Sequence, residues 1–67
     1  MIALVINGKA HRFDSDINVA QLLEQLALKD KRVALEKNGE IVLRSRFNEE
    51  ILRDGDKLEI VVAVGGG

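Results

Sequence analysis

The sequence contains no cysteine. This absence excludes disulfide bonds, thiolate metal sites and a cysteine nucleophile within the chain, and it is consistent with a reducing cytoplasm, where we expect the protein to act. The formal net charge is −1, so no basic excess draws the chain to nucleic acid or to an anionic membrane. No apolar run approaches the roughly 20 residues of a spanning helix. No basic segment precedes the first apolar stretch, so we expect no signal peptide.

What is present fits one small globular domain. The chain has 67 residues, of which 46% are hydrophobic and 31% charged, and we find no internal linker or repeat. A chain of this size buries only about 60% of the surface that it exposes when unfolded. There is therefore little room for an internal active-site cavity.

Two Asn-Gly pairs predict two β-hairpins, because both residues tolerate the positive φ angles of tight hairpin turns. Asn7-Gly8 separates strand-like residues 1–6 from 9–13, and Asn38-Gly39 separates 33–37 from a short strand at 40–43. In the first hairpin a strict two-residue loop would place His11 opposite the apolar Leu4. We therefore expect either an edge position for the second strand or a slightly longer turn.

A helix is predicted to begin after Asn18, whose side chain can cap it, with Gln21 three residues later completing a capping box. Its apolar stripe consists of Val19, Leu22, Leu23 and Leu26, which follow the i, i+3, i+4, i+7 spacing of one helical face. The charged residues 29–32 end the helix as a solvated loop.

The C-terminal half is predicted to contain an irregular segment, a turn and the longest strand. Residues 44–52 form the irregular segment, which Phe47 and Ile51 attach to the core. Residues 54–56 form the turn. Residues 57–64 form the strand, with Leu58, Ile60, Val62 and Val64 on one face.

This order of elements predicts an α+β fold of the β-grasp type. A mixed sheet of about four to five strands packs against one main helix, and the long last strand lies at its centre beside the first strand. The domain comprises residues 1–64. Residues 65–67 are three glycines, which we expect to form a flexible tail.

Several segments together resemble the sulfur carrier proteins of the ubiquitin-like superfamily, most closely those of thiamine biosynthesis. The resemblance extends from about Leu4 to Gly67. The order and spacing of the segments, with the terminal glycines, make it specific, whereas each segment alone is weak. Leu43 and Phe47 depart from it, since proline and tryptophan are common at those positions. The matching residues are 6–8, 18–23, 33–42, Arg44, 54–60 and 64–67.

The resemblance implies that the chemistry takes place at the C-terminal carboxylate of Gly67. An adenylyltransferase of the ubiquitin-activating type would adenylate this carboxylate, and a sulfur donor, a cysteine desulfurase or a related protein, would convert it to a thiocarboxylate for thiazole synthase. The partner uses the ATP and magnesium, because this chain has no P-loop. The chain itself would be a protein co-substrate with no bound cofactor. Gly65 and Gly66 suit a narrow enzyme channel because they lack side chains.

Three further residues are candidates for docking a partner. Val61 and Ala63 alternate with the core-facing residues of the last strand, so they face outward, either as a partner surface or as ordinary exposed residues. Arg44 belongs to either a docking patch or a solvated loop. A lone His11 makes no recognisable site, and Asp54 and Asp56 are too few carboxylates for a metal.

Three other functions remain open. One is the small subunit of molybdopterin synthase, which shares the fold and the diglycine end but is usually longer. Another is a ubiquitin-like modifier conjugated to target lysines through Gly67. The last is an interaction domain with an inert tail.

Overall fold

The computed structural model describes residues 1–63, and all structural statements below concern this part of the chain. Its elements follow in the order β1 (Ile2–Ile6), β2 (Lys9–Phe13), β3 (Ile17–Asn18), α1 (Val19–Gln25), β4 (Val33–Lys37), β5 (Glu40–Val42), the 3-10 turn η1 (Arg44–Arg46), β6 (Ile51–Leu52) and β7 (Lys57–Val62).

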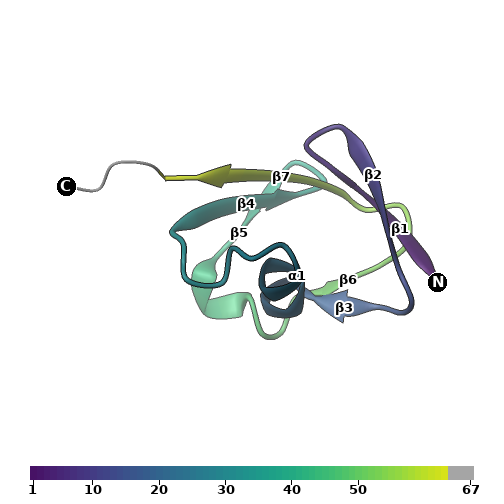
Figure 1. Ribbon diagram of the computed structural model, residues 1–67. Coiled ribbons are helices and arrows are strands. Elements are labelled where there is room, and N and C mark those ends of the chain that lie inside the picture. Colours follow the sequence, from purple (N-terminus) through teal and green to yellow (C-terminus); the bar gives the residue numbers. More distant parts are fainter. Residues whose placement is uncertain (64–67) are drawn as a thin grey trace.

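Five of the strands form one mixed sheet in the order β2-β1-β7-β4-β5. The first and last strands, β1 and β7, lie parallel at its centre, whereas the other neighbours are antiparallel. Helix α1 lies across one face, and the short strands β3 and β6 pair beside it (Figure 1). The predicted β-grasp arrangement, with the last strand central beside the first, is confirmed.

Both Asn-Gly pairs form the predicted hairpin turns. The φ angles are 50° and 83° at Asn7 and Gly8, and 51° and 87° at Asn38 and Gly39, as primed turns require. In the first hairpin Leu4 does lie opposite His11. The expected longer turn is therefore wrong, and the alternative holds: β2 is an edge strand, and its His11 is half-exposed.

Helix α1 begins as predicted and ends earlier. The Oδ1 of Asn18 accepts from the N–H of Gln21 at 2.7 Å, and the Oε1 of Gln21 accepts from the N–H of Asn18 at 2.9 Å, which completes the capping box. The helix stops at Gln25, so Leu26 is its C-cap and only partly buried. Ala27 follows with φ 61°, a left-handed conformation that usually requires glycine.

The core lies between the helix and the sheet. It is made entirely of apolar side chains: Ile2, Leu4, Ile6, Ile17, Val19, Leu22, Leu23, Leu35, Phe47, Leu52, Leu58 and Ile60. Phe47 packs there as predicted, but the prediction for Ile51 is wrong, since Ile51 is 40% exposed and Leu52 is fully buried. The segment is not irregular throughout: residues 51–52 form β6, whose neighbouring side chains must face opposite sides.

Strand β7 presents Leu58 and Ile60 to the core and leaves Val62 partly buried, as the predicted alternation requires. The same prediction extended the strand to Val64 and treated residues 65–67 as a separate tail. Residues 64–67 lie outside the described part of the chain, so both statements remain predictions.

Candidate functional site

The end of β7 is the part of the described structure nearest in sequence to the predicted reaction site, Gly67. Gly65, Gly66 and Gly67 themselves lie outside the described residues. The predicted docking residues Val61 and Ala63 are exposed, Val61 by 64%. The N–H of Ala63 donates to the carbonyl of Arg32 at 2.9 Å, which ties the end of the strand to the residue before β4.

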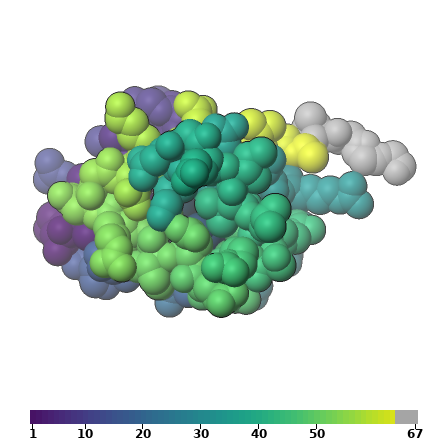
Figure 2. Space-filling view, turned by 180° about the vertical axis from the view of Figure 1, so that it is seen from behind, coloured from purple at the N-terminus to yellow at the C-terminus, as the bar shows by residue number. Residues whose placement is uncertain are grey.

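The structure brings the three predicted docking residues together. A groove of about 370 Å³ is lined by Val61, Ala63 and Arg44 and also by Arg32, Val33 and Ala34. Arg44 is positioned by a hydrogen bond from its Nη2 to the carbonyl of Lys31, at 3.4 Å. In Figure 2 the yellow end of β7 lies at the rim of the molecule. The groove therefore opens where the chain leaves the sheet.

The groove combines a small apolar floor with two positive charges. Val61 and Ala34 are direct cross-strand neighbours on the face of the sheet turned away from α1. Arg32 and Arg44 line the same groove, and none of its lining residues is acidic. Such a surface suits a partner with apolar side chains and complementary negative charge.

Sequence reasoning did not identify Arg32 and Ala34 as candidates. The position of both residues in the groove depends on the pairing of β4 with β7, which places Ala34 opposite Val61 and Arg32 beside Ala63. No local pattern in residues 32–34 indicates this register. Sequence reasoning also did not predict that two apolar side chains would be exposed at β5. Ile41, in the strand, is 73% exposed, and Leu43, just after it, is 64% exposed.

Two hairpin asparagines hold β7 in place from its two sides. The carboxamide of Asn7 accepts from the N–H of Ile60 at 2.8 Å and donates to its carbonyl at 3.1 Å. The Oδ1 of Asn38 accepts from the N–H of Lys57 at 2.9 Å, and its Nδ2 donates to Asp56 at 3.0 Å. The strand that precedes residues 65–67 in the sequence is therefore held by these side chains as well as by its neighbouring strands.

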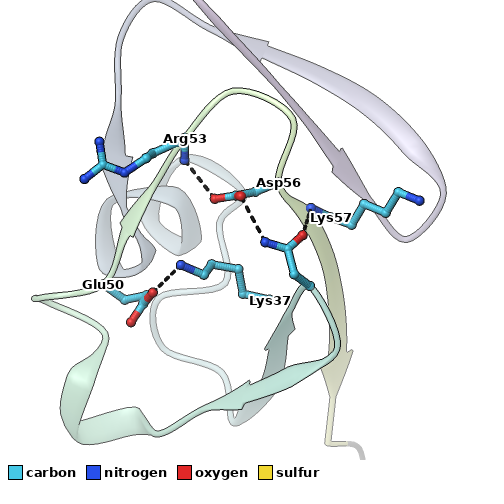
Figure 3. Close-up of polar contacts among 6 residues, drawn as sticks. Lys37, Glu50, Arg53, Asp56 and Lys57 are labelled. Atoms are coloured by element: carbon cyan, nitrogen blue, oxygen red, sulfur yellow. Dashed lines mark hydrogen bonds and ion pairs between the residues drawn. The ribbon is translucent and has the colours of Figure 1, made fainter.

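The turn before β7 is reinforced by further polar contacts (Figure 3). The second carboxylate oxygen of Asp56 accepts from the N–H of Arg53 at 2.9 Å. A half-buried ion pair joins Lys37 of β4 to Glu50, which precedes β6. These contacts connect β4, β6 and the start of β7, and they involve none of the residues that line the groove.

Residues 1–63 contain no group of three or more His, Cys, Asp or Glu side chains placed to hold a metal ion. Among the same residues no helix is long and apolar enough to cross a membrane. The structure therefore brings the three predicted docking residues together in one groove beside the end of β7.

The ThiS family model matches residues 4–67. The chain belongs to the ThiS family. The sulfur carrier protein ThiS of Bacillus subtilis is 42% identical over 65 residues, which is 96% of this chain and 98% of that protein. The crystal structure of a thiamine biosynthesis protein (ThiS) from Geobacter metallireducens is 35% identical, with a TM-score of 0.83 over 98% of this chain and 100% of the other. The predicted identity, a ThiS-type sulfur carrier of thiamine biosynthesis, is confirmed.

A thiazole synthase of Paramagnetospirillum magneticum also contains a region similar to this member of the ThiS family. The two are 45% identical over 64 residues, which is 96% of this chain but only 20% of that protein. The chain thus spans about one-fifth of this larger relative.

Proposed function

We propose that this chain carries sulfur as a thiocarboxylate at the C-terminal carbon of Gly67 and donates it in the formation of thiazole. The observation that carries the proposal is the match of the ThiS family model, which runs through to Gly67. The chain acts as a protein co-substrate rather than as an enzyme. We expect this chemistry in the cytoplasm.

The first step activates a carboxylate, which by itself is a poor acyl donor. One oxygen of the Gly67 carboxylate attacks the α-phosphorus of ATP, and pyrophosphate leaves. The product is an acyl-adenylate with a good leaving group. This sequence contains no P-loop, so we assign the binding of ATP and magnesium to a partner. The partner that we propose is an adenylyltransferase of the ubiquitin-activating type.

The second step exchanges oxygen for sulfur. A sulfur nucleophile from a donor, a cysteine desulfurase or a related protein, attacks the acyl carbon, and AMP leaves with the bonding electron pair. When the donor carries a persulfide, this attack leaves an acyl disulfide between Gly67 and the donor. A thiol, the reductant of this step, then attacks the donor's sulfur atom: the S–S bond breaks, the thiol and the donor form a disulfide, and Gly67 keeps the terminal sulfur as a thiocarboxylate. Cysteine is absent from the sequence, so a persulfide on this chain is not an alternative store of sulfur.

The glycine tail suits delivery into enzyme active sites. Three extended residues span about 10 Å, and without side chains they fit a narrow channel. The groove formed by Val61, Ala63, Arg44, Arg32, Val33 and Ala34 lies just before the tail. An enzyme that takes up the tail would cover this groove, and Val61 and Arg44 would then contact it.

Thiazole synthase is the proposed acceptor of the sulfur. The thiazole synthase of Paramagnetospirillum magneticum contains a region 45% identical to this chain, which supports a close working relation between the two activities. The test is to supply purified thiazole synthase with the sulfur-loaded chain and measure thiazole formation.

The matched control for this test is a chain truncated after Val64. The full chain should support thiazole formation after loading, and the truncated chain should not. Sulfur delivered only to the large subunit of molybdopterin synthase would overturn the thiazole assignment, and high-mass lysine adducts would indicate a modifier instead.

A further inference from the structure

The two edges of β7 are paired to different lengths. On one edge, pairing with β4 extends from Leu58 to Val62. On the other edge, pairing with β1 covers only Lys57 and Leu58, because β1 ends where the chain turns at Asn7. Figure 1 shows β7 continuing beyond the first hairpin with β4 on one side and no strand on the other.

Asn7 extends the shorter ladder by one step. Its backbone N–H donates to the carbonyl of Leu58 at 2.9 Å, as a β1 residue would. Its side-chain carboxamide then bonds both the N–H and the carbonyl of Ile60. The side chain thus takes the place of the next backbone groups of β1, and the backbone of β7 is satisfied on this edge as far as Ile60.

After Ile60, Val62 is the next residue of β7 whose backbone groups face this edge. The N–H of Ala63 bonds Arg32, and the carbonyl of Lys57 bonds the N–H of Asn38, so odd-numbered residues of β7 direct their backbone groups toward β4. Even-numbered residues direct theirs to the opposite edge. Within residues 1–63, pairing with β1 on this edge ends at Leu58 and the Asn7 side chain bonds Ile60, so neither supplies a partner for the N–H or the carbonyl of Val62.

We infer that the open edge of β7 at Val62, the last residue of the strand, binds an extended segment of the adenylating enzyme by β-strand pairing. The inference rests on the proposed function, which requires the enzyme to enclose the chain up to Gly67. Enclosure removes water from the N–H and the carbonyl of Val62, and buried backbone groups need replacement partners. The three glycines after Val64 have no side chains for an enzyme to bind, so hydrogen bonds to backbone groups are the main polar contacts by which an enzyme can hold this end of the chain.

A proline substitution tests the pairing. Val62→Pro removes an N–H that faces the open edge, where proline is tolerated in strands, and it also replaces the partly buried valine side chain. The residue before it, Val61, is already extended in β7, as a residue preceding proline must be.

Val62→Thr is the matched control, since threonine is β-branched and keeps the N–H. We expect Val62→Pro to lower kcat/KM of adenylation by about tenfold or more and Val62→Thr to change it by less than about threefold, given the usual strength of a backbone hydrogen bond. Equal values for the two folded variants would overturn the inference.

Amide hydrogen exchange of the unmodified chain tests the pairing without relying on a folded proline variant. The Val62 amide should exchange rapidly in the free chain and about tenfold or more slowly in the complex with the adenylating enzyme. The Val61 and Ile60 amides, which face β4 and Asn7, serve as internal controls. Normal adenylation with unchanged exchange at Val62 would overturn the pairing and leave the proposed function intact, whereas no adenylation of the chain would refute the proposed function. Protection that rises with concentration of the free chain would assign the edge to a second copy and would also overturn the inference.

Discussion

The side chain of Asn7 bonds both backbone groups of Ile60, 53 residues further along the chain. It joins the first hairpin turn to the centre of the last strand, where β1 no longer provides a partner. A residue that the sequence presents as a turn former therefore also holds the strand that leads to Gly67.

Replacing Asn7 with glycine should destabilise the fold by about 1–3 kcal/mol, the usual cost of leaving buried polar groups without partners. Glycine retains the positive φ of 50° at this position, and the entropic cost of introducing a glycine is shared by the control below, so the difference between the two reports the side-chain bonds. Asn38→Gly is the matched control, because its bonds to Lys57 and Asp56 are exposed. Urea titration should give the larger loss for Asn7→Gly, and a larger loss for Asn38→Gly would contradict this interpretation.

Ala27→Gly should stabilise the protein by about 0.5–1 kcal/mol. Ala27 adopts φ 61° directly after the C-cap of α1, where a Cβ atom is unfavourable and glycine is the usual residue. Ala20→Gly, within the helix, should have the opposite effect and destabilise the protein by about 1 kcal/mol. Thermal unfolding of both variants checks the pair, and a lower midpoint for Ala27→Gly would show that the turn is not strained.

Leu23→Ala should cost about 2–5 kcal/mol, as for other buried leucines. Leu23 is 5% exposed, whereas Leu26 is only partly buried at the C-cap, so Leu26→Ala should cost less. Leu43→Ala is an exposed control and should stay within about 0.5 kcal/mol of the unmodified protein. Denaturant titrations that rank Leu26 above Leu23 would mean that the helix packs differently from the structure.

Val61→Asp should weaken binding to the adenylating enzyme or to thiazole synthase by about tenfold or more and leave the fold intact. Val61 is exposed beside the end of β7, so a charge there costs little until a partner covers it. Ile51→Asp is the control, since Ile51 is also exposed but lies on β6, in the separate two-stranded sheet. Calorimetry against both partners should distinguish the two variants, and equal affinities would remove the docking role of the groove.

Local sequence chemistry was sufficient to predict most of the fold. Asn7-Gly8 and Asn38-Gly39 determine two turns by their own backbone preferences, and Asn18 with Gln21 determines the start of the helix. The pair β3 and β6 was missed because each strand has two residues, too few to show alternation. For the same reason the sequence could not distinguish Ile51 from Leu52 as the buried residue.

The candidate site was only partly predictable. Val61 and Ala63 were found from the alternation of a long strand, and that alternation is a local property. Arg32 and Ala34 join them only through the register between β4 and β7. A register between strands far apart in the sequence depends on the packing of the whole sheet.

The central claim is that Gly67 is the sulfur-bearing residue, and mass spectrometry tests it most directly. The chain is incubated with its adenylating enzyme, ATP, magnesium and a sulfur donor, and the position of any added sulfur is located by fragmentation. Gly66→Val should impair the exchange strongly, because a misplacement of about 1 Å at the reacting atoms can cost about a hundredfold in rate. A chain extended by one residue after Gly67 should not react at all. The account predicts one oxygen replaced by sulfur at the terminal carboxyl group of Gly67. An unchanged mass, under conditions in which the Bacillus subtilis sulfur carrier is converted, would contradict it.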